Sequence, residues 1–366
     1  MTIDSATTDH TPTTPVISPD SDTVWYTRCP VPTASGLANS LGWLGEPASA
    51  AGLGFSILQD AGAELAPRHF DHQLSGLIRE GGNVPAIVAR ASGSPTRLIG
   101  LTWIDESQSI LVGPDSDIDD AAGLRGRRVG IPAWAVDQAR SFPRAMSLHG
   151  FASALALGGL TFADVIVVET AGNWEPRVRT AEADRLRSVP SGFPELLNGD
   201  VDAIYVKGAR AAEAAAEHGL RVLVDLDSTE SRRSRVNNGT PRPITVHESL
   251  LQEHPEVVVG FLAASLRAAD WAAGNLGRVR EVLARETFSG PDGVVAAYGD
   301  DFHTSLHPSL SEERLDLLGI QKRFLYTYGF LPADFDIESW VDPEPLRRAL
   351  DEIGSATAAA ADSGGE

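Results

Sequence analysis

Short apolar runs alternate with stretches of helical character along most of the chain. In the first third, runs rich in β-branched and aromatic residues predict strands at 24–28, 54–58, 96–104 and 109–113. Helices are predicted between these strands at 33–44 and 85–91. Regular alternation of strand and helix is typical of an α/β protein whose sheets are covered by helices.

The alternation continues through the middle of the chain. Residues 118–131 predict a short helix that leads into a strand, and residues 193–206 predict a helix, a turn and a strand. Further helices are predicted at 144–157 and 209–218, and further strands at 165–169 and 221–225. From His247 to Ala349 the pattern is mostly helical. This order predicts mainly parallel sheets.

A chain of 366 residues is too long for one compact core of ordinary size, so the elements predict two lobes. We place the second lobe at 114–222 and the first, discontinuous lobe at 23–113 and 223–354. The acidic, Thr/Pro-rich residues 1–22 predict a flexible leader, and the Ala/Ser/Gly-rich residues 355–366 predict a flexible tail.

Charge narrows the range of partners. Fifty acidic residues against thirty basic ones leave a formal charge of −20 at pH 7, which repels nucleic acid and anionic membranes. No apolar run approaches the ~18 residues of a membrane span, and the start of the chain lacks the basic and apolar regions of a secretion signal. We therefore expect a cytoplasmic protein without nucleic-acid or membrane partners, and we expect a monomer.

Cys29 is the single cysteine, so the chain cannot form an internal disulfide or a thiolate metal cluster. It follows the first predicted strand and precedes a predicted helix, whose positive dipole end favours a thiolate. The alternative interpretation is a small buried apolar residue.

A second informative stretch holds His69, Phe70, Arg79 and the glycine pair 81–82. A guanidinium can donate two parallel hydrogen bonds to an oxyanion, and glycine lets backbone amides approach a ligand. These residues predict an anion site, and the alternative is a polar surface loop. The other histidines lack metal-site spacing, and no phosphate-binding glycine motif stands in the required context, so we predict neither metal nor cofactor.

Together these residues resemble the 2'-hydroxybiphenyl-2-sulfinate desulfinase family of arylsulfinate desulfinases, which acts last in the oxidative desulfurisation of dibenzothiophene. The specific similarities are Cys-Pro-Val-Pro at 29–32, His69-Phe70, and Arg79 followed by Gly81-Gly82. Broader similarities lie at 97–101, 124–130 and 199–205, and within the last two the pieces Gly-Arg-Arg-Val-Gly and Gly-Asp-Val-Asp-Ala are shared with solute-binding proteins.

The resemblance implies a two-lobed, periplasmic-binding-protein-like (type II) fold with a cleft between the lobes. It also implies a hydrolase that cleaves an aryl carbon–sulfur bond and releases sulfite without a cofactor. Cys29, His69 and Arg79 fall on the family's catalytic positions, with Arg79 and Gly82 binding the sulfinate and Phe70 beside the aryl group.

Three alternatives stay open at this point. The substrate can be 2'-hydroxybiphenyl-2-sulfinate or a smaller, benzothiophene-derived sulfinate, with Trp134 or Trp174 completing the aryl pocket. Cys29 can protonate the ring carbon, or its thiolate can attack sulfur. A non-catalytic binding protein of the same fold for an aromatic anion is the alternative function.

Overall fold

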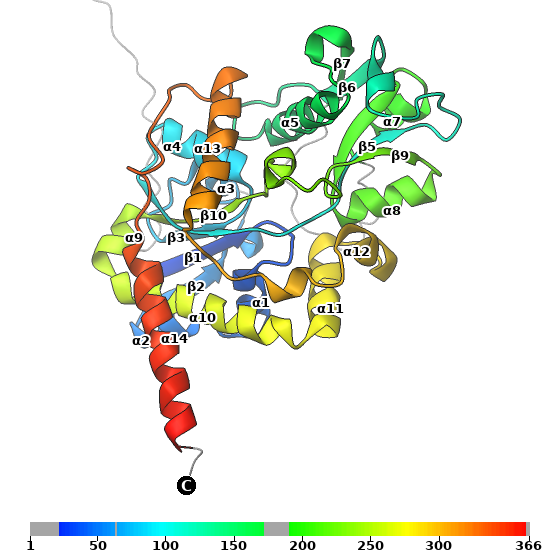
Figure 1. The fold of residues 1–366 in the computed structure, drawn as a ribbon. Coiled ribbons are helices and arrows are strands. Elements are labelled where there is room, and N and C mark those ends of the chain that lie inside the picture. The colour runs from blue at the N-terminus through cyan, green and yellow to red at the C-terminus, as the bar shows by residue number, and fades with distance from the viewer. Residues whose placement is uncertain (1–21, 63, 172–189, 364–366) are drawn as a thin grey trace, which may run out of the picture.

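The computed structural model describes residues 22–62, 64–171 and 190–363. Within them the strands form two separate five-stranded sheets, each flanked by helices (Figure 1). The predicted α/β, two-lobed architecture is confirmed by this arrangement and by solved structures of the same fold.

The first sheet has the strand order β2-β1-β3-β10-β4. Its strands are β1 (Thr23–Arg28), β2 (Gly54–Ile57), β3 (Leu77–Glu80), β4 (Thr96–Thr102) and β10 (Arg242–His247). β1 pairs in parallel with β2 and β3, whereas β10 pairs antiparallel with β3 and β4. Among the described strands of this sheet, β10 is therefore the one that runs against the others.

The second sheet repeats this plan with the order β7-β6-β8-β5-β9. Its strands are β5 (Gln108–Val112), β6 (Arg128–Pro132), β7 (Ile166–Thr170), β8 (Ala203–Lys207) and β9 (Arg221–Asp225). β6 pairs in parallel with β7 and β8, and β5 pairs antiparallel with β8 and β9. Both sheets are thus mainly parallel with one reversed strand, as the sequence predicts.

Helices cover both sheets. Those described are α1 (Ala34–Ser40), α2 (Glu46–Ala50), α3 (Arg68–Asp71), α4 (Asn83–Ala91), α5 (Phe142–Leu157), α7 (Phe193–Leu197), α8 (Ala209–Glu217), α9 (Glu248–Glu253), α10 (Pro255–Ala273), α11 (Leu276–Thr287), α12 (Pro291–Ala297), α13 (Glu312–Thr327) and α14 (Glu344–Ser363). In the described part of the chain no single helix is long and apolar enough to cross a membrane, and α10 with α11 meets that test only as a pair bent by 118°.

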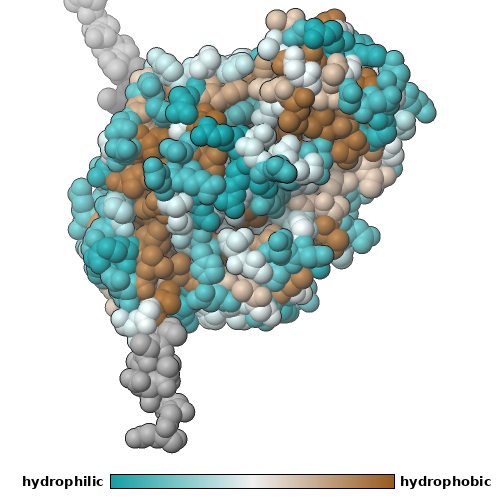
Figure 2. Space-filling model, in the orientation of Figure 1, coloured by the Kyte–Doolittle hydropathy of each residue, from teal (hydrophilic) through white to brown (hydrophobic). Residues whose placement is uncertain are grey.

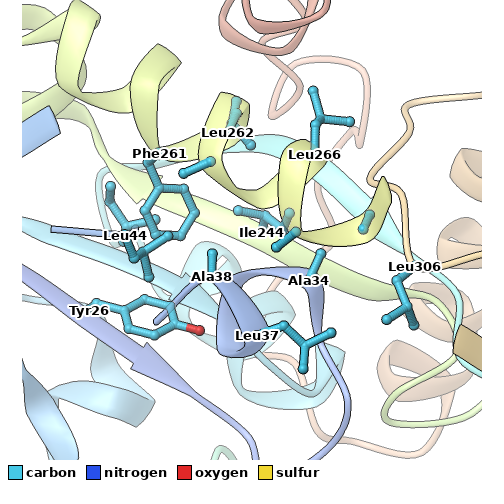
Figure 3. Packing of buried hydrophobic residues seen from close by; sticks show 14 of the residues in the cluster. Tyr26, Ala34, Leu37, Ala38, Leu44, Ile244, Phe261, Leu262, Leu266 and Leu306 are labelled. Carbon is cyan, nitrogen blue, oxygen red and sulfur yellow. The ribbon is translucent and has the colours of Figure 1, made fainter. Parts of the chain in front are cut away.

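The largest core lies between the first sheet and the helices α1 and α10 (Figure 3). Tyr26 of β1 and Ile244 of β10 project into it from the sheet, and Leu37 and Phe261 meet them from the helices. These side chains are at most 1 % exposed, so each contributes roughly 1.5–3 kcal/mol of burial free energy. Hydrophilic side chains cover much of the face seen in Figure 2.

The chain crosses between the sheets twice, from β4 to β5 at 103–107 and from β9 to β10 at 226–241. The strand β5 therefore pairs within the second sheet, although the sequence analysis assigns residues 108–112 to the first lobe. Its apolar sequence suits either sheet, so only its pairing partners decide the assignment.

Two strands and one helix differ from the sequence expectations. β3 and β10 are not predicted, because β3 contains the charged pair Arg79 and Glu80, and β10 begins with Arg-Pro. α14 continues to Ser363 through most of the stretch predicted as a flexible tail, because alanine has the highest helix propensity.

Candidate functional site

A cavity of about 830 Å³ opens where β1 and β3 end and faces β8 and α5 of the second lobe. It is lined from the first lobe by the ends of β1, β2 and β3, and by α3. The second lobe contributes Phe142, Met146 and residues 207–210, and the returning crossing contributes Asn238. In parallel sheets ligands bind at the carboxyl ends of strands, which is where this cavity lies.

Cys29 directly follows β1, and its side chain is partly buried in the cavity wall. Its backbone N–H donates to the carbonyl of Glu80 at 3.2 Å, which continues the β1–β3 pairing by one residue. The Sγ atom accepts a hydrogen bond from the Gly82 N–H at 3.2 Å. Gly82 caps α4, so the thiol contacts the start of this helix and not of the helix that follows it in sequence.

His69 lies on the short helix α3 and lines the same cavity. Its Nδ1 is 2.8 Å from the Thr27 hydroxyl, which also accepts from Gln59 Nε2 at 3.0 Å. Burial, reinforced by the positive charge of Arg79, holds the pKa of His69 well below its usual value. The imidazole is therefore neutral at neutral pH and oriented by the hydroxyl.

Arg79 lies on β3 and is fully buried, in contrast to the surface loop that is the alternative interpretation of its sequence. Its Nε donates to the His69 carbonyl at 3.1 Å, and its Nη2 is 3.5 Å from His69 Nε2. Burial lowers the pKa of Arg79 to about 10, and electrostatic interaction with the neighbouring Cys29 opposes the shift. The group remains a cation at neutral pH, and its Nη1 has no hydrogen-bond partner among the described residues.

Positions 81 and 82 have to be glycine because neighbouring side chains approach both backbone positions closely. A Cβ on Gly81 would lie 2.8 Å from the guanidinium carbon of Arg79, and a Cβ on Gly82 would lie 2.5 Å from Asn238 Oδ1. The Asn238 side chain in turn accepts from the Val84 N–H at 2.8 Å in the first turn of α4. The two glycines thus let the guanidinium, the thiol and the start of α4 meet.

Phe70 and Phe142 form the aromatic part of the cavity wall. Their rings are stacked with centroids 6.4 Å apart. The rings of His69 and Phe70 meet edge to face, with centroids 4.8 Å apart. Trp134, an alternative from sequence, packs on Phe330 and does not line this cavity. Trp174, the other alternative, lies outside the described residues.

The structure brings all five predicted site residues, Cys29, His69, Phe70, Arg79 and Gly82, to one cavity. Sequence reasoning missed Thr27, Phe142 and Asn238. The Asn-Asn-Gly turn signal at 237–239 was the available clue to the last of these, because such turns place side chains beside strand ends. In the described part of the chain, no three His, Cys, Asp or Glu side chains gather to hold a metal ion.

No protein-family model matches the chain. It is 29% identical over 356 residues to the 2'-hydroxybiphenyl-2-sulfinate desulfinases of Rhodococcus erythropolis and Rhodococcus qingshengii, covering 90% of this chain and 94% of theirs. The resemblance to the desulfinases is confirmed.

Solved structures agree with this similarity to the desulfinases. A cysteine-to-serine mutant of the desulfinase DszB, in complex with biphenyl-2-sulfinic acid, superposes with a TM-score of 0.72 at 28% identity. The match covers 90% of this chain and 99% of that one.

Sulfonate-binding proteins share the fold. The periplasmic aliphatic sulphonate-binding protein of Escherichia coli has a TM-score of 0.62 at 16% identity over 88% of this chain and 92% of its own. A putative aliphatic sulfonates-binding protein of Bacillus subtilis is 26% identical, over 75% of this chain and 72% of its own. The predicted cytoplasmic location is contradicted by the periplasmic relatives, because the fold operates in that compartment too, and we withdraw it.

Proposed function

We propose that this chain is an arylsulfinate desulfinase that converts an arylsulfinate and water into the arene and sulfite. The observation that carries the proposal is the meeting of Cys29, His69 and Arg79 in one cavity of a chain similar to desulfinases over 90% of its length. The named relatives support an enzyme that acts on the carbon–sulfur bond of a sulfinate. That the enzyme is a hydrolase, with water as the second reactant, is our further proposal.

Arg79 is the proposed anchor of the sulfinate. Its unpaired Nη1 and its position at the cavity wall make it available to a sulfinate oxygen, and its Nε bond to the His69 carbonyl holds the guanidinium plane. The Gly82 N–H, which contacts Cys29 Sγ, supplies a second donor beside the sulfur. The sulfinate would then lie between the thiol and the guanidinium, with its ring toward Phe70.

Cys29 can take part in the reaction by either of two routes. In the first, the thiol gives its proton to the ring carbon, the carbon–sulfur bond breaks, and SO₂ leaves and adds water to become bisulfite. In the second, the thiolate attacks sulfur, the aryl group takes a proton, and water releases bisulfite from the thiosulfonate intermediate. Neutral His69, held by Thr27, lines the same cavity as the thiol, and its proposed role in both routes is to orient the sulfur.

The cavity volume of about 830 Å³ accommodates a two-ring sulfinate as well as a smaller benzothiophene-derived one. Both remain within the proposed substrate class.

The proposal is tested by sulfite release. Purified protein is incubated separately with biphenyl-2-sulfinate, 2'-hydroxybiphenyl-2-sulfinate and a benzothiophene-derived sulfinate. Sulfite and arene are both quantified, and they are expected in equal amounts. Cys29→Ser is expected to abolish turnover and to keep binding of the sulfinate. Turnover by Cys29→Ser at the wild-type rate would remove the cysteine from the reaction.

The second candidate is a non-catalytic binding protein, which the 26% identity to a putative sulfonate-binding protein favours. It predicts saturable binding of arylsulfinates, or of the corresponding sulfonates, with no sulfite formed. The same assay, with binding followed by calorimetry, separates the two functions.

A further inference from the structure

Two cations meet at the wall of the cavity, and one of them, Arg242, lies near enough to Arg79 for its charge to help lower the pKa of Arg79. Lys207 ends β8 of the second lobe, and Arg242 begins β10 of the first. They approach each other across Gly239, where an added Cβ would lie 2.6 Å from Arg242 Nη2 and 3.0 Å from Lys207 Nζ. Their side chains are 6% and 3% exposed, and both line the cavity that contains Cys29.

Neither cation has hydrogen-bond partners for all of its donors. Lys207 Nζ and the Nε and Nη1 atoms of Arg242 are buried without a hydrogen-bond partner among the described residues. Glu106 stands 3.5 Å from Lys207 and 3.9 Å from Arg242, and its other oxygen accepts from Tyr298 at 2.7 Å. One carboxylate at this distance balances at most one of the two charges, and an unpaired buried charge is costly.

Two further acids lie near this pair. One is Glu80, which is buried, feels the charge of Arg242 and accepts hydrogen bonds from Ser35 and Thr102. The other is Asp227. Its carboxyl forms no ion pair with Lys207 within the described residues, and burial raises its pKa to about 7, although Lys207 opposes that shift. Asp227 is thus only partly ionised at neutral pH. The buried donors of Lys207 and Arg242 that lack a hydrogen-bond partner are therefore what this part of the cavity offers to an acceptor.

Two other cavity cations form close ion pairs, although Arg28 Nη1 also lacks a hydrogen-bond partner among the described residues. Arg28 donates two hydrogen bonds to Glu286, at 2.5 and 3.1 Å, and Arg210 donates to Glu213 at 2.7 Å. A purely structural tie between the lobes would close in the same way onto Glu106. Lys207 and Arg242 instead keep donors free at the wall of a ligand cavity.

Resting on the proposed function, we infer that the substrate is an arylsulfinate carrying a second, fully ionised oxyanion, a carboxylate in its simplest form, which Lys207 and Arg242 bind. The sulfinate occupies the Arg79 and Cys29 end of the cavity. The second oxyanion then accepts from the donors of Lys207 and Arg242 that lack a hydrogen-bond partner. A neutral phenol hydroxyl offers an acceptor without a negative charge, so it is the weaker substituent.

The test compares biphenyl-2-sulfinate with its 2'-carboxylate and 2'-hydroxyl derivatives on the full-length protein. Wild type is expected to prefer the 2'-carboxylate over the unsubstituted sulfinate by roughly 10- to 100-fold in kcat/KM, which is the usual contribution of hydrogen bonds to charged groups. The 2'-hydroxyl compound should gain less. In Lys207→Met the preference for the carboxylate should fall to a few-fold or less.

The chain offers a matched control, because Lys322 is its only other lysine, does not line the cavity, and donates to Asp334 and to the Phe335 carbonyl. Lys322→Met removes the same charge and should keep the full carboxylate preference. Inhibition by biphenyl-2,2'-dicarboxylate, compared with biphenyl-2-carboxylate, measures the same preference by binding alone and in wild type, so it holds even where Lys207→Met fails to fold.

The outcomes separate the two proposals. Sulfite release from biphenyl-2-sulfinate with no gain from the carboxylate, and equal inhibition by the mono- and dicarboxylate, would overturn the second-oxyanion site and leave the desulfinase intact. A gain for the 2'-hydroxyl compound equal to that for the carboxylate would also overturn it. Absence of sulfite from every sulfinate overturns the desulfinase, while tighter binding of biphenyl-2,2'-dicarboxylate than of biphenyl-2-carboxylate, measured by calorimetry, would still support the binding site.

Discussion

The sulfur of Cys29 accepts a hydrogen bond from the backbone N–H of Gly82 at 3.2 Å, across 53 positions of sequence. The contact joins the end of β1 to the first turn of α4 and places the only thiol beside Arg79. It exists because β1 and β3 are parallel neighbours, so the residues that follow both strands meet at one sheet edge.

Substituting Gly82 by alanine is expected to disrupt this contact. The added Cβ would lie 2.5 Å from Asn238 Oδ1 and 2.7 Å from the Asn238 carbonyl, so α4 or the 237–241 segment must move. We expect kcat/KM for an arylsulfinate to fall at least roughly tenfold and the unfolding free energy to fall by about 1–3 kcal/mol. Gly113→Ala is the control, because an added Cβ there meets nothing within 4 Å. Equal kinetics for both variants would contradict the close-approach argument.

Thr27 is a positioning residue, since it reaches the reaction through His69. Thr27→Val keeps the side-chain shape and removes the hydroxyl that contacts His69 Nδ1 at 2.8 Å. We expect kcat to fall roughly tenfold with KM nearly unchanged, because the imidazole loses its orientation while the sulfinate keeps Arg79. Steady-state kinetics measure the split, with Thr327→Val as an exposed control. A change confined to KM would assign Thr27 to substrate binding instead.

Arg79→Lys tests the geometry of the anion site separately from its charge. A lysine ammonium cannot hold the His69 carbonyl and two sulfinate oxygens in one plane. We expect kcat/KM to fall by roughly 100-fold, with both a higher KM and a lower kcat. Arg347→Lys, at an exposed position on α14, should match wild type. Wild-type kinetics in Arg79→Lys would exclude Arg79 from sulfinate binding.

His149 should make the protein less stable in mild acid. Burial lowers its pKa to about 4, although a hydrogen bond with Gln321 opposes the shift, whereas an unfolded histidine titrates near 6.5. The folded state therefore binds fewer protons, so the stabilisation is complete above about pH 6.5 and is lost as the pH falls toward 4. Relative to His149→Gln, wild type should lose about 2 kcal/mol of unfolding free energy between pH 7 and pH 5, as measured by denaturant titration. Parallel pH curves would contradict this assignment.

Several sequence expectations stay predictions. They are the monomeric state, the lack of nucleic-acid and membrane partners, and the catalytic roles of Cys29, His69 and Arg79. The lobe boundaries at 113–114 and 222–223 also stay predictions. In the structure, β5 and β9 pair with each other in the second sheet.

Local pattern predicted the elements whose side chains match their environment. The strands β1, β4 and β5 and the helices α4, α5 and α8 were all predicted, because apolar periodicity directly reflects burial. Pattern failed for β3, whose residues Leu77–Glu80 are all buried although two of them are charged. Arg79 is held there by the His69 carbonyl, and Glu80 by Ser35 and Thr102, partners that lie far away in sequence.

The amino-acid sequence by itself determined the alternating α/β order, the single thiol, and the short motifs that carry the similarity to desulfinases. Only the tertiary structure decided which charges are buried, which of them are paired, and that Lys207 and Arg242 from different lobes meet at Gly239. The physical reason is that the energy of a buried charge depends on its partners in space, and parallel strands bring those partners from distant parts of the chain.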